Sequence, residues 1–549
     1  MTKKERILII SLFGLIIIAS SLLCFQSWLK QTKVVPKEGG EYTEAIIGQP
    51  RFINPILAQT NDPDQDLSKL IFSGLLKYNS KGELVPDLAE KYAIGDYGRI
   101  YDFFLRKDIL WHDGESFGAD DVIFTIKTIQ NPDYKSPLRR KWKGIEVEKL
   151  DERTVRFKLK TPYAPFLSNL TVGILPCHIW KYIGPSNFPF AEYNLKKPIG
   201  TGPYKSSQFK KDKNGKIKLF VLTSNENYYG KVPYLEKINF KFYPSEEEAI
   251  ASYNKKEVSG INYISAANID KIRNKENLRL YSLSIPRYFA VFFNQNKSKV
   301  LSDKTVRLAL AYATDKKELI DKVLLGQGET VETPILPYLL GYNPETKIYD
   351  FAVEHANNIL ERDGWQDKNG DGVREKGDLH LEFTLITTDW PELVKTANLL
   401  KDQWAKIGAK VNVKTPPVAE IQQNYIHPRE YEALLFGEVL GGDPDPFAFW
   451  HSSQRKDPGL NLALYSSEEV DTLLEEGRTN LDPDVRAEKY RRFQEIIVDD
   501  VPAIFLYSPT YLYAVNRKIQ GIELKNVVLP SERFCDVENW YIKTRRVRK

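Results

Sequence analysis

Residues 107–124 read KDILWHDGESFGADDVIF, the most distinctive stretch of the 549-residue chain. Tyr101–Leu105, just before it, has the composition of a strand, and His112–Asp113–Gly114 has the residue types of a tight turn. Ala119–Ile129 has the apolar spacing of a helix, with acidic residues near its start, where the helix dipole favours negative charge. The segment therefore predicts a strand, a turn and a helix. Trp111, beside the turn, is either a packing residue or a ligand contact.

A similar mixture of elements continues on both sides of this segment. Alternating apolar residues predict strands and wider spacing predicts helices. A chain of this length is too long for one core, so we expect an α/β protein with more than one lobe. The expected strands are 41–47, 145–150, 154–159, 219–223, 238–243, 288–294, 411–414, 503–507 and 511–515, and the expected helices are 67–76, 119–129, 305–325, 391–407 and 483–498.

The N-terminus has the features of a membrane anchor. Residues 7–29 carry no charge and are long enough to cross a hydrocarbon core of about 30 Å as a helix. The basic residues 1–6 predict a cytoplasmic N-terminus and a body outside the cytoplasm. A cleaved signal is the alternative, although no small-residue cleavage site follows, and Leu23 before Cys24 disfavours a lipid anchor. We expect a single-pass transmembrane helix followed by a polar tether over 30–40.

The charge of the chain is unevenly distributed. The net charge is +5, but residues 1–37 and the basic tail 543–549 each carry +5, which leaves −5 for the body. An acidic body lacks the basic surface that nucleic acids require, so no nucleic-acid partner is expected. Cys24, Cys177 and Cys535 have no CxxC spacing, and whether the last two pair depends on their geometry.

The residue patterns favour binding over catalysis. The six histidines show no HxxH spacing, and the chain has no G-x-S-x-G nucleophile elbow and no P-loop. We therefore expect a protein that is not an enzyme, with an extracytoplasmic hydrolase as the less favoured alternative.

Residues 367–378, reading DKNGDGVREKGD, match an EF-hand loop in part. Gly372 occupies the turn position, but Arg374 stands where the loop usually has an apolar residue, and a strand pattern follows instead of a helix. A structural calcium site and a solvated turn both stay open, and no other cofactor is expected. The calcium ligands would be Asp367, Asn369, Asp371, the carbonyl of Val373, and Asp378.

Several ordered motifs resemble those of the bacterial family-5 extracellular solute-binding proteins, the dipeptide- and oligopeptide-binding components of ABC importers. They extend over most of the chain, which makes a chance match improbable. The motifs are Asn54–Pro55, Phe72–Tyr78, Leu84–Ala93, the 107–124 segment, PIGTGPY at 198–204, FFNQN and VRLALAYA within 292–313, Gly442–Trp450 and Asn461–Leu474.

The resemblance implies a bilobal fold like that of periplasmic binding proteins, with an extra inserted domain. The chain would cross between the lobes near Phe292 and near Tyr511. By this resemblance lobe I comprises 41–55, 199–285 and 513–542, the inserted domain II comprises 56–198, and lobe II comprises 286–512.

The resemblance also implies a function. A monomeric protein of this kind buries a solute, here most simply a peptide, between its lobes and passes it to the permease subunits of an ABC importer. The same closure could instead report ligand occupancy to a membrane receptor, so a ligand-sensing protein stays open as an alternative.

The loop that recognises peptides in this family departs from its usual pattern here. In peptide-binding members an acid in this loop pairs with the ligand's α-ammonium. The loop reads GEVLGGDPDPF at 437–447, and that position falls on Leu440. Because an unpaired ammonium is costly to bury, a blocked peptide, a sugar or another neutral solute also stays open. The expected ligand contacts are Asn61, Trp111, Glu438, Gly441, Gly442, Asp443 and Trp450.

Overall fold

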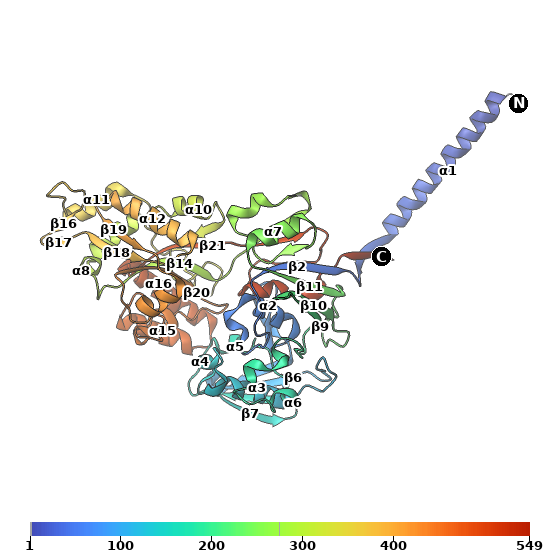
Figure 1. Cartoon of the computed structure of the whole chain (residues 1–549), viewed down its shortest axis with the longest axis horizontal. Helices are drawn as coiled ribbons and strands as arrows, with labels where there is room; N and C mark the ends of the chain where they lie inside the picture. Colours follow the sequence, from blue (N-terminus) through green and yellow to red (C-terminus); the bar gives the residue numbers. More distant parts are fainter. Residues whose placement is uncertain (1–2, 274) are drawn as a thin grey trace.

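The computed structural model describes residues 3–273 and 275–549. Figure 1 shows two lobes side by side, with a long N-terminal helix that projects away from the lobe containing β2. This helix, α1 (Lys3–Gln31), contains the largely apolar stretch Leu8–Gln31, which reaches a mean hydropathy of 2.7 over an 18-residue window, and none of that window is buried in the protein. Its length and composition suit a membrane span, and a signal sequence near an N-terminus has the same properties.

Lobe I is built on a seven-stranded sheet in which distant parts of the chain meet. Its order is β13-β22-β12-β2-β11-β10-β9; β2 is parallel to β11 and β12, and the other pairs are antiparallel. The predicted strands at 219–223 and 238–243 are confirmed as β10 and β11. The bounds are β2 (Glu41–Ile47), β9 (Tyr204–Lys211), β10 (Ile217–Ser224), β11 (Lys237–Tyr243), β12 (Gly260–Ile261), β13 (Leu278–Leu283) and β22 (Tyr511–Asn516).

The segment between β2 and β9, the inserted domain, supplies α2 (Asp62–Ile71) and a small four-stranded sheet of order β5-β6-β8-β7. It shares one hydrophobic core with the seven-stranded sheet and is counted below as part of lobe I. The strand, turn and helix predicted around 107–124 are confirmed as β6 (Ile100–Leu105) and α3 (Ala119–Gln130). The predicted hairpin is formed by β7 (Glu146–Asp151) and β8 (Thr154–Lys158), and β5 spans Ala89–Gly95.

The helix predicted over 67–76 begins and ends earlier than expected. Asp62, Pro63 and Asp64 provide a first turn with proline near the start and acids at the positive end of the dipole. Phe72 is extended and ends the helix.

Lobe II is built on a six-stranded sheet of order β15-β21-β14-β20-β18-β19, with one hydrophobic core on each face. The predicted helix over 305–325 is two helices, because the side chain of Asp315 accepts a hydrogen bond from the amide of Glu318 and caps a new helix there. The strands are β14 (Arg287–Phe293), β15 (Gly328–Thr330), β18 (Glu382–Ile386), β19 (Lys410–Lys414), β20 (Ala433–Val439) and β21 (Ala503–Pro509); the main helices are α9 (Lys304–Tyr312), α10 (Lys316–Val323), α11 (Val353–Arg362), α12 (Pro391–Ala405), α15 (Glu468–Thr479) and α16 (Pro483–Asp500).

Shorter elements complete the two lobes. They are β3 (Leu76–Tyr78), β4 (Leu84–Pro86), β16 (Glu375–Lys376), β17 (Leu379–His380), α4 (Arg139–Trp142), α5 (Phe166–Asn169), α6 (Cys177–Trp180), α7 (Glu246–Asn254), α8 (Lys299–Ser302), α13 (Val418–Ile421) and α14 (Phe447–Trp450).

The chain crosses between the two large sheets twice, through residues 284–286 and through Thr510. The second crossing lies next to the predicted position. The first lies several residues before Phe292, which is buried inside β14 in a lobe II core and is not a hinge residue.

The predicted tether and the basic tail are not loose segments. β1 (Thr32–Lys37) pairs antiparallel with β23 (Lys543–Arg548), and α1 ends at Gln31 directly before β1. Neither strand has the apolar alternation that identifies a buried strand, so their pairing is not evident from the sequence. Gly39 and Gly40 then adopt positive φ angles of 107° and 100°, which lets the chain turn into β2.

Candidate functional site

The two lobes touch on the side of the small four-stranded sheet. The hydroxyl of Tyr163 donates a hydrogen bond of 3.1 Å to Oδ2 of Asp445, and Nη2 of Arg478 donates one of 2.9 Å to the same oxygen. The guanidinium carbon of Arg478 lies 4.9 Å from the ring centre of Tyr163 and 4.2 Å from that of Phe447. We call Tyr163, Asp445, Phe447 and Arg478 the interlobe latch.

Further contacts surround the latch. Arg140 donates hydrogen bonds of 2.8 Å to the carbonyl of Pro458 and to Oε1 of Gln454. Gly442 faces Tyr78 so closely that a Cβ atom on Gly442 would lie 2.8 Å from the Tyr78 hydroxyl oxygen. These residues come from both lobes, so the structure represents a state in which the lobes are together.

A cavity of about 170 Å³ lies between the lobes beside the two crossings, and we call it the hinge cavity. Both lobes contribute to its wall, and the wall is rich in aromatic rings, which suits a binding site for an organic solute. Lining residues include Tyr263 from lobe I, and Arg287, Phe289, Trp390, Glu392 and Tyr507 from lobe II.

Arg287 is a positively charged residue in the wall of the hinge cavity. It is the first residue of β14, and its Nε is buried without a hydrogen-bond partner among the described residues. Burial lowers the pKa of Arg287, and Tyr263 and Asp62 only partly oppose this effect at longer range. The guanidinium is half-buried and lies 5.8 Å from the ring centre of Phe289, and its unsatisfied Nε suits an anionic group on a ligand.

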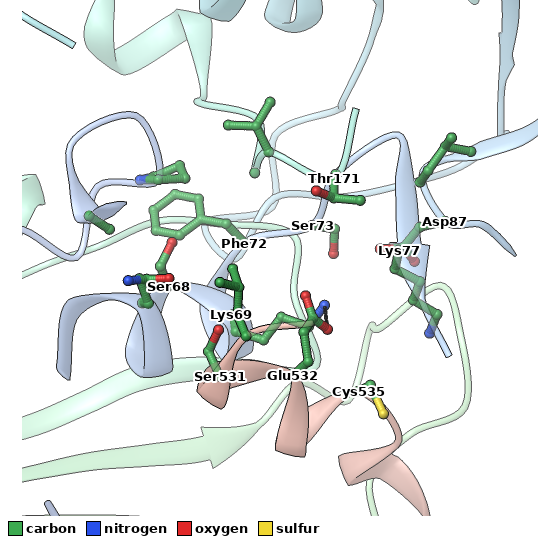
Figure 2. Close-up of a pocket in the computed structure, with 18 of the residues that line it drawn as sticks. Ser68, Lys69, Phe72, Ser73, Lys77, Asp87, Thr171, Ser531, Glu532 and Cys535 are labelled. Atoms are coloured by element: carbon green, nitrogen blue, oxygen red, sulfur yellow. Dashed lines mark ion pairs between the residues drawn. The ribbon is translucent and has the colours of Figure 1, made fainter. Parts of the chain in front are cut away.

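A second cavity, of about 200 Å³, lies between α2 and the segment 138–173 (Figure 2). Figure 2 shows Lys69 and Glu532 pointing toward each other at its floor, and their charged atoms are 2.8 Å apart. Lys77 likewise lies 3.7 Å from Glu538. Because Lys69 and Lys77 are paired with acids of the protein, they are less available to a charged ligand than Arg287 of the hinge cavity is.

The structure does not place the two predicted tryptophans at the cleft. Trp111 is 2% exposed in the hydrophobic core of lobe I, and Trp450 is 1% exposed in a core of lobe II. Both rings pack inside a hydrophobic core, where large apolar side chains are commonly found.

Glu438 also points away from the hinge cavity. It lies opposite Tyr288 in the β14–β20 pair, and the Tyr288 hydroxyl donates a hydrogen bond to it inside the lobe II core. Burial raises the pKa of Glu438 to about 8. Because side chains alternate along a strand, the neighbouring Arg287 lies on the other face and reaches the cavity. Arg287 carries no sequence motif; its position at the start of an aromatic strand was the only available signal.

The other predicted contacts lie in different parts of the structure. Asp443 is paired within lobe II by hydrogen bonds of 2.6 and 3.1 Å from Arg486. Asn61 precedes α2, and its Nδ2 donates to the carbonyl of Gln49. Gly441 has a positive φ of 82°, which glycine adopts without strain, and its added Cβ would meet no atom within 4 Å, unlike that of Gly442.

The acidic loop gathers a different set of carboxylates from the predicted one. Asp367, Asp371 and Glu375 have ligand atoms within 4.8 Å of one another, and Glu375 takes the place expected for Asp378. Asp367 already accepts hydrogen bonds from the amides of Gly370 and Gly372, as in an ordinary turn. Calcium binding stays a prediction.

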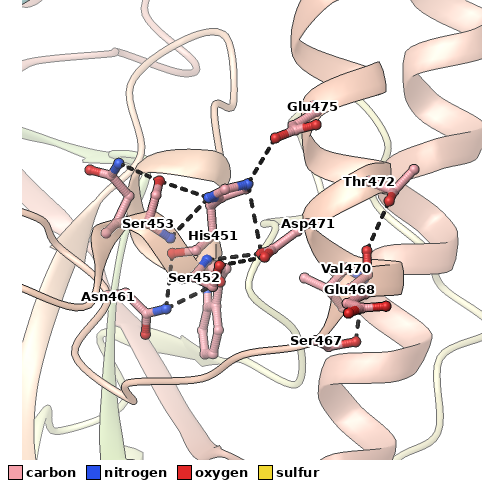
Figure 3. Close-up of polar contacts among 12 residues, drawn as sticks. His451, Ser452, Ser453, Asn461, Ser467, Glu468, Val470, Asp471, Thr472 and Glu475 are labelled. Atoms are coloured by element: carbon pink, nitrogen blue, oxygen red, sulfur yellow. Dashed lines mark hydrogen bonds and ion pairs between the residues drawn. The ribbon is translucent and has the colours of Figure 1, made fainter.

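A serine, histidine and acid cluster in lobe II resembles a catalytic arrangement only superficially (Figure 3). Nε2 of His451 lies 3.2 Å from Glu475, and Nδ1 lies 2.8 Å from the Ser453 hydroxyl. However, Nδ1 also accepts from the Ser453 amide, so the imidazole caps the short helix that begins at Ser452. Local capping accounts for these contacts.

The three cysteines are free. Cys24 is exposed on α1, Cys177 is half-buried, and Cys535 is buried beside the second cavity.

Comparisons with known proteins agree with this architecture. Residues 83–459 match the family described as bacterial extracellular solute-binding proteins, family 5 Middle. The chain is 29% identical over 520 residues to the oligopeptide-binding protein AppA of Bacillus subtilis, with 93% of each chain covered.

Two solved structures share the fold. The structure of AppA from Bacillus subtilis in complex with a nonapeptide aligns with a TM-score of 0.73 and 28% identity, covering 93% of this chain and all of that one. NikZ from Campylobacter jejuni in complex with Ni(L-His) aligns with a TM-score of 0.74 and 29% identity, covering 92% of this chain and all of that one. The chain therefore belongs to the family-5 bacterial extracellular solute-binding proteins, with their two-lobed α/β fold.

Proposed function

We propose that the protein captures a peptide between its lobes and delivers it, chemically unchanged, to an ABC importer. The observation that carries this proposal is the hinge cavity, which both lobes line and in which the Nε of Arg287 has no hydrogen-bond partner among the described residues. A peptide with a free carboxylate would place that end in the cavity and supply the missing anion, and the aromatic walls would accept the apolar part of the same residue. The nonapeptide bound to the related AppA supports a peptide as the ligand.

In this proposal the cation Arg287 pairs with a carboxylate of the peptide. The family resemblance implies the opposite arrangement, in which an acid of the protein pairs with the peptide's ammonium. By the family resemblance the ammonium-binding position falls on Leu440, and Glu438 and Asp443 are engaged within lobe II. Selectivity would therefore rest on the carboxylate of the ligand, from its C-terminus or from an acidic side chain.

A pair of peptide sets tests this proposal. The full chain in detergent is incubated with nonapeptides of mixed sequence, either free or amidated at the C-terminus, or with Ni(L-His), and retained ligands are identified by mass spectrometry. We expect retention of free-acid peptides and a loss of about 10- to 150-fold in affinity for Arg287→Gln, since a hydrogen bond to a charged group is worth about 1.5–3 kcal/mol. Arg491→Gln, an exposed arginine of lobe II, is the control.

Retention of Ni(L-His), and of no peptide, would contradict the peptide assignment, because NikZ shows that the fold also accommodates a metal complex. Equal retention of free and amidated peptides by the unaltered chain would remove Arg287 from the recognition of the carboxylate. Turnover of the peptides would contradict a purely binding role. Ligand-dependent signalling in cells without uptake would favour the sensing alternative.

We also propose that α1 stays attached as a single-pass anchor, with the monomeric body outside the cytoplasm. The uncharged length of α1 supports this topology. The intact mass of the protein extracted from membranes tests it, because a cleaved signal would remove residues of α1.

A further inference from the structure

The segment that joins α1 to lobe I, and the segment that pairs with it, are rich in basic residues. Residues 30–37 and 543–549 contain eight lysines and arginines and no acidic residue. The β1–β23 pair brings these two segments together, and we call residues 30–37 with 543–549 the cationic ribbon. All eight basic residues are exposed: Lys30, Lys33, Lys37, Lys543, Arg545, Arg546, Arg548 and Lys549.

The charges of the cationic ribbon are not neutralised by the protein. None of the eight forms an ion pair with a described residue of the chain, whose body carries a net negative charge. Two antiparallel strands alone are marginally stable in water, and repulsion between neighbouring cations adds to the cost. An external anionic surface would relieve that repulsion.

The antiparallel register places the chain terminus beside the end of the apolar helix. Thr32 pairs with Arg548, and the amide of Lys549 donates a hydrogen bond of 2.9 Å to the carbonyl of Gln31. The guanidinium carbon of Arg546 lies 5.0 Å from the ring centre of Trp28 in the last turns of α1. Tryptophan at a helix end is typical of the lipid–water interface, so these cations would lie close to the headgroups.

We propose that the cationic ribbon lies on the anionic phospholipid headgroups of the membrane that α1 crosses, and thereby fixes the orientation of lobe I above the bilayer. This inference rests on the proposed retention of α1. Charge complementarity favours anionic lipid, because polybasic segments beside a membrane span are attracted to such headgroups within about a Debye length of 8–10 Å. Lobe I would then be presented to the membrane in one orientation rather than turning freely on a tether.

Hydrogen exchange of the full chain in lipid nanodiscs tests the proposal. The nanodiscs contain phosphatidylcholine alone or phosphatidylcholine mixed with phosphatidylglycerol. We expect the amides of 32–37 and 543–548 to exchange about tenfold more slowly in the anionic nanodiscs, and the difference to disappear at high salt.

A charge-neutral variant and a matched control sharpen the test. Lys33→Gln, Arg545→Gln, Arg548→Gln and Lys549→Gln together remove side-chain charges that make no hydrogen bond within the described chain, and this variant should lose the lipid effect. Lys317→Gln, Lys368→Gln, Lys401→Gln and Lys414→Gln remove the same charge from exposed positions of lobe II, away from α1, and should keep it.

Equal exchange of the ribbon in both lipids would overturn the proposal, and so would a lipid effect that persists in the charge-neutral variant. An acidic surface on a protein partner would then be the remaining explanation for the charge. The anchor is judged separately, because the amides of Leu8–Gln31 should be protected in both lipids if α1 spans the bilayer.

Discussion

Tyr163 donates a hydrogen bond of 3.1 Å to Asp445, although the two residues are 282 positions apart and belong to different lobes. Arg478 shares the same carboxylate oxygen and lies against the Tyr163 ring. Opening of the lobes would separate Tyr163 from both partners. The interlobe latch therefore stabilises the state in which the lobes are together, and a ligand that bridges them gains from it.

Removing the Tyr163 hydroxyl should weaken ligand binding without unfolding the protein. A hydrogen bond to a charged group contributes about 1.5–3 kcal/mol, so Tyr163→Phe should lower ligand affinity by about 10- to 150-fold, measured by calorimetric titration. Tyr182→Phe changes a 79% exposed tyrosine of lobe I and should leave the affinity unchanged. Unaltered affinity in Tyr163→Phe would mean that the latch does not contribute to closure.

A methyl group at residue 442 should act as a wedge between the lobes. The Cβ of Gly442→Ala would lie 2.8 Å from the Tyr78 hydroxyl oxygen, which is closer than van der Waals contact allows. Overpacking of this kind costs about 1–3 kcal/mol, so ligand affinity should fall by about 5- to 150-fold. Small-angle scattering with ligand present should show a more extended protein than the unaltered chain does.

Gly441→Ala is the matched control for that wedge. Gly441 has a positive φ of 82° and no atom within 4 Å of an added Cβ, so its substitution strains the backbone without filling the interface. It should lower the melting temperature but leave the ligand-bound dimensions unchanged. Similar scattering from both variants would contradict a specific contact at residue 442.

The buried Glu438 should make the stability of lobe II depend on pH. Burial raises its pKa from 4.5 to about 8, so the folded protein holds a proton that the unfolded chain releases between these values. This contribution to stability is complete below about pH 4.5 and is lost as the pH rises through about 8, with a slope of up to about 1.4 kcal/mol per pH unit.

Glu438→Gln should remove that dependence and raise the melting temperature at pH 9 relative to the unaltered chain. The comparison is a thermal-unfolding series from pH 5 to pH 9. Glu430→Gln, an exposed carboxylate of lobe II that pairs with Lys297, is the control and should preserve the dependence. An identical pH profile for Glu438→Gln and the unaltered chain would show that Glu438 does not titrate in this way.

Arg287 should lower the stability of the ligand-free protein while it contributes to ligand affinity. Its buried Nε lacks a partner among the described residues, and removing an uncompensated buried charge is often stabilising. Arg287→Met should therefore raise the melting temperature of the ligand-free protein by a few degrees while ligand affinity falls. A lower melting temperature would indicate that Arg287 supports the fold.

Local patterns in the sequence predict many of the individual elements. The alternation in Tyr101–Leu105 and the helical spacing after Gly118 correspond to β6 and α3, because these features depend on residues close together in the chain. Pairings between distant segments are different. The β1–β23 ribbon joins two polar segments more than 500 residues apart, and the sequence of neither strand specifies the other.

The candidate site is harder to predict because a shift of one residue along a strand reverses the direction of its side chain. Glu438 is one of the expected ligand contacts, but it faces a core, while Arg287 faces the hinge cavity. The resemblance to the family identifies the loop 437–447, yet only the packed strands decide which side chains of the region reach the cleft.

A peptide held between the lobes should leave them chemically unchanged. Native mass spectrometry of the full chain in detergent, before and after mild unfolding in the presence of a defined nonapeptide mixture, is the direct test. The predicted result is a bound mass that is released as intact peptide and is lost in Arg287→Gln. Release of cleaved fragments, or a bare chain at every peptide concentration, would contradict the claim.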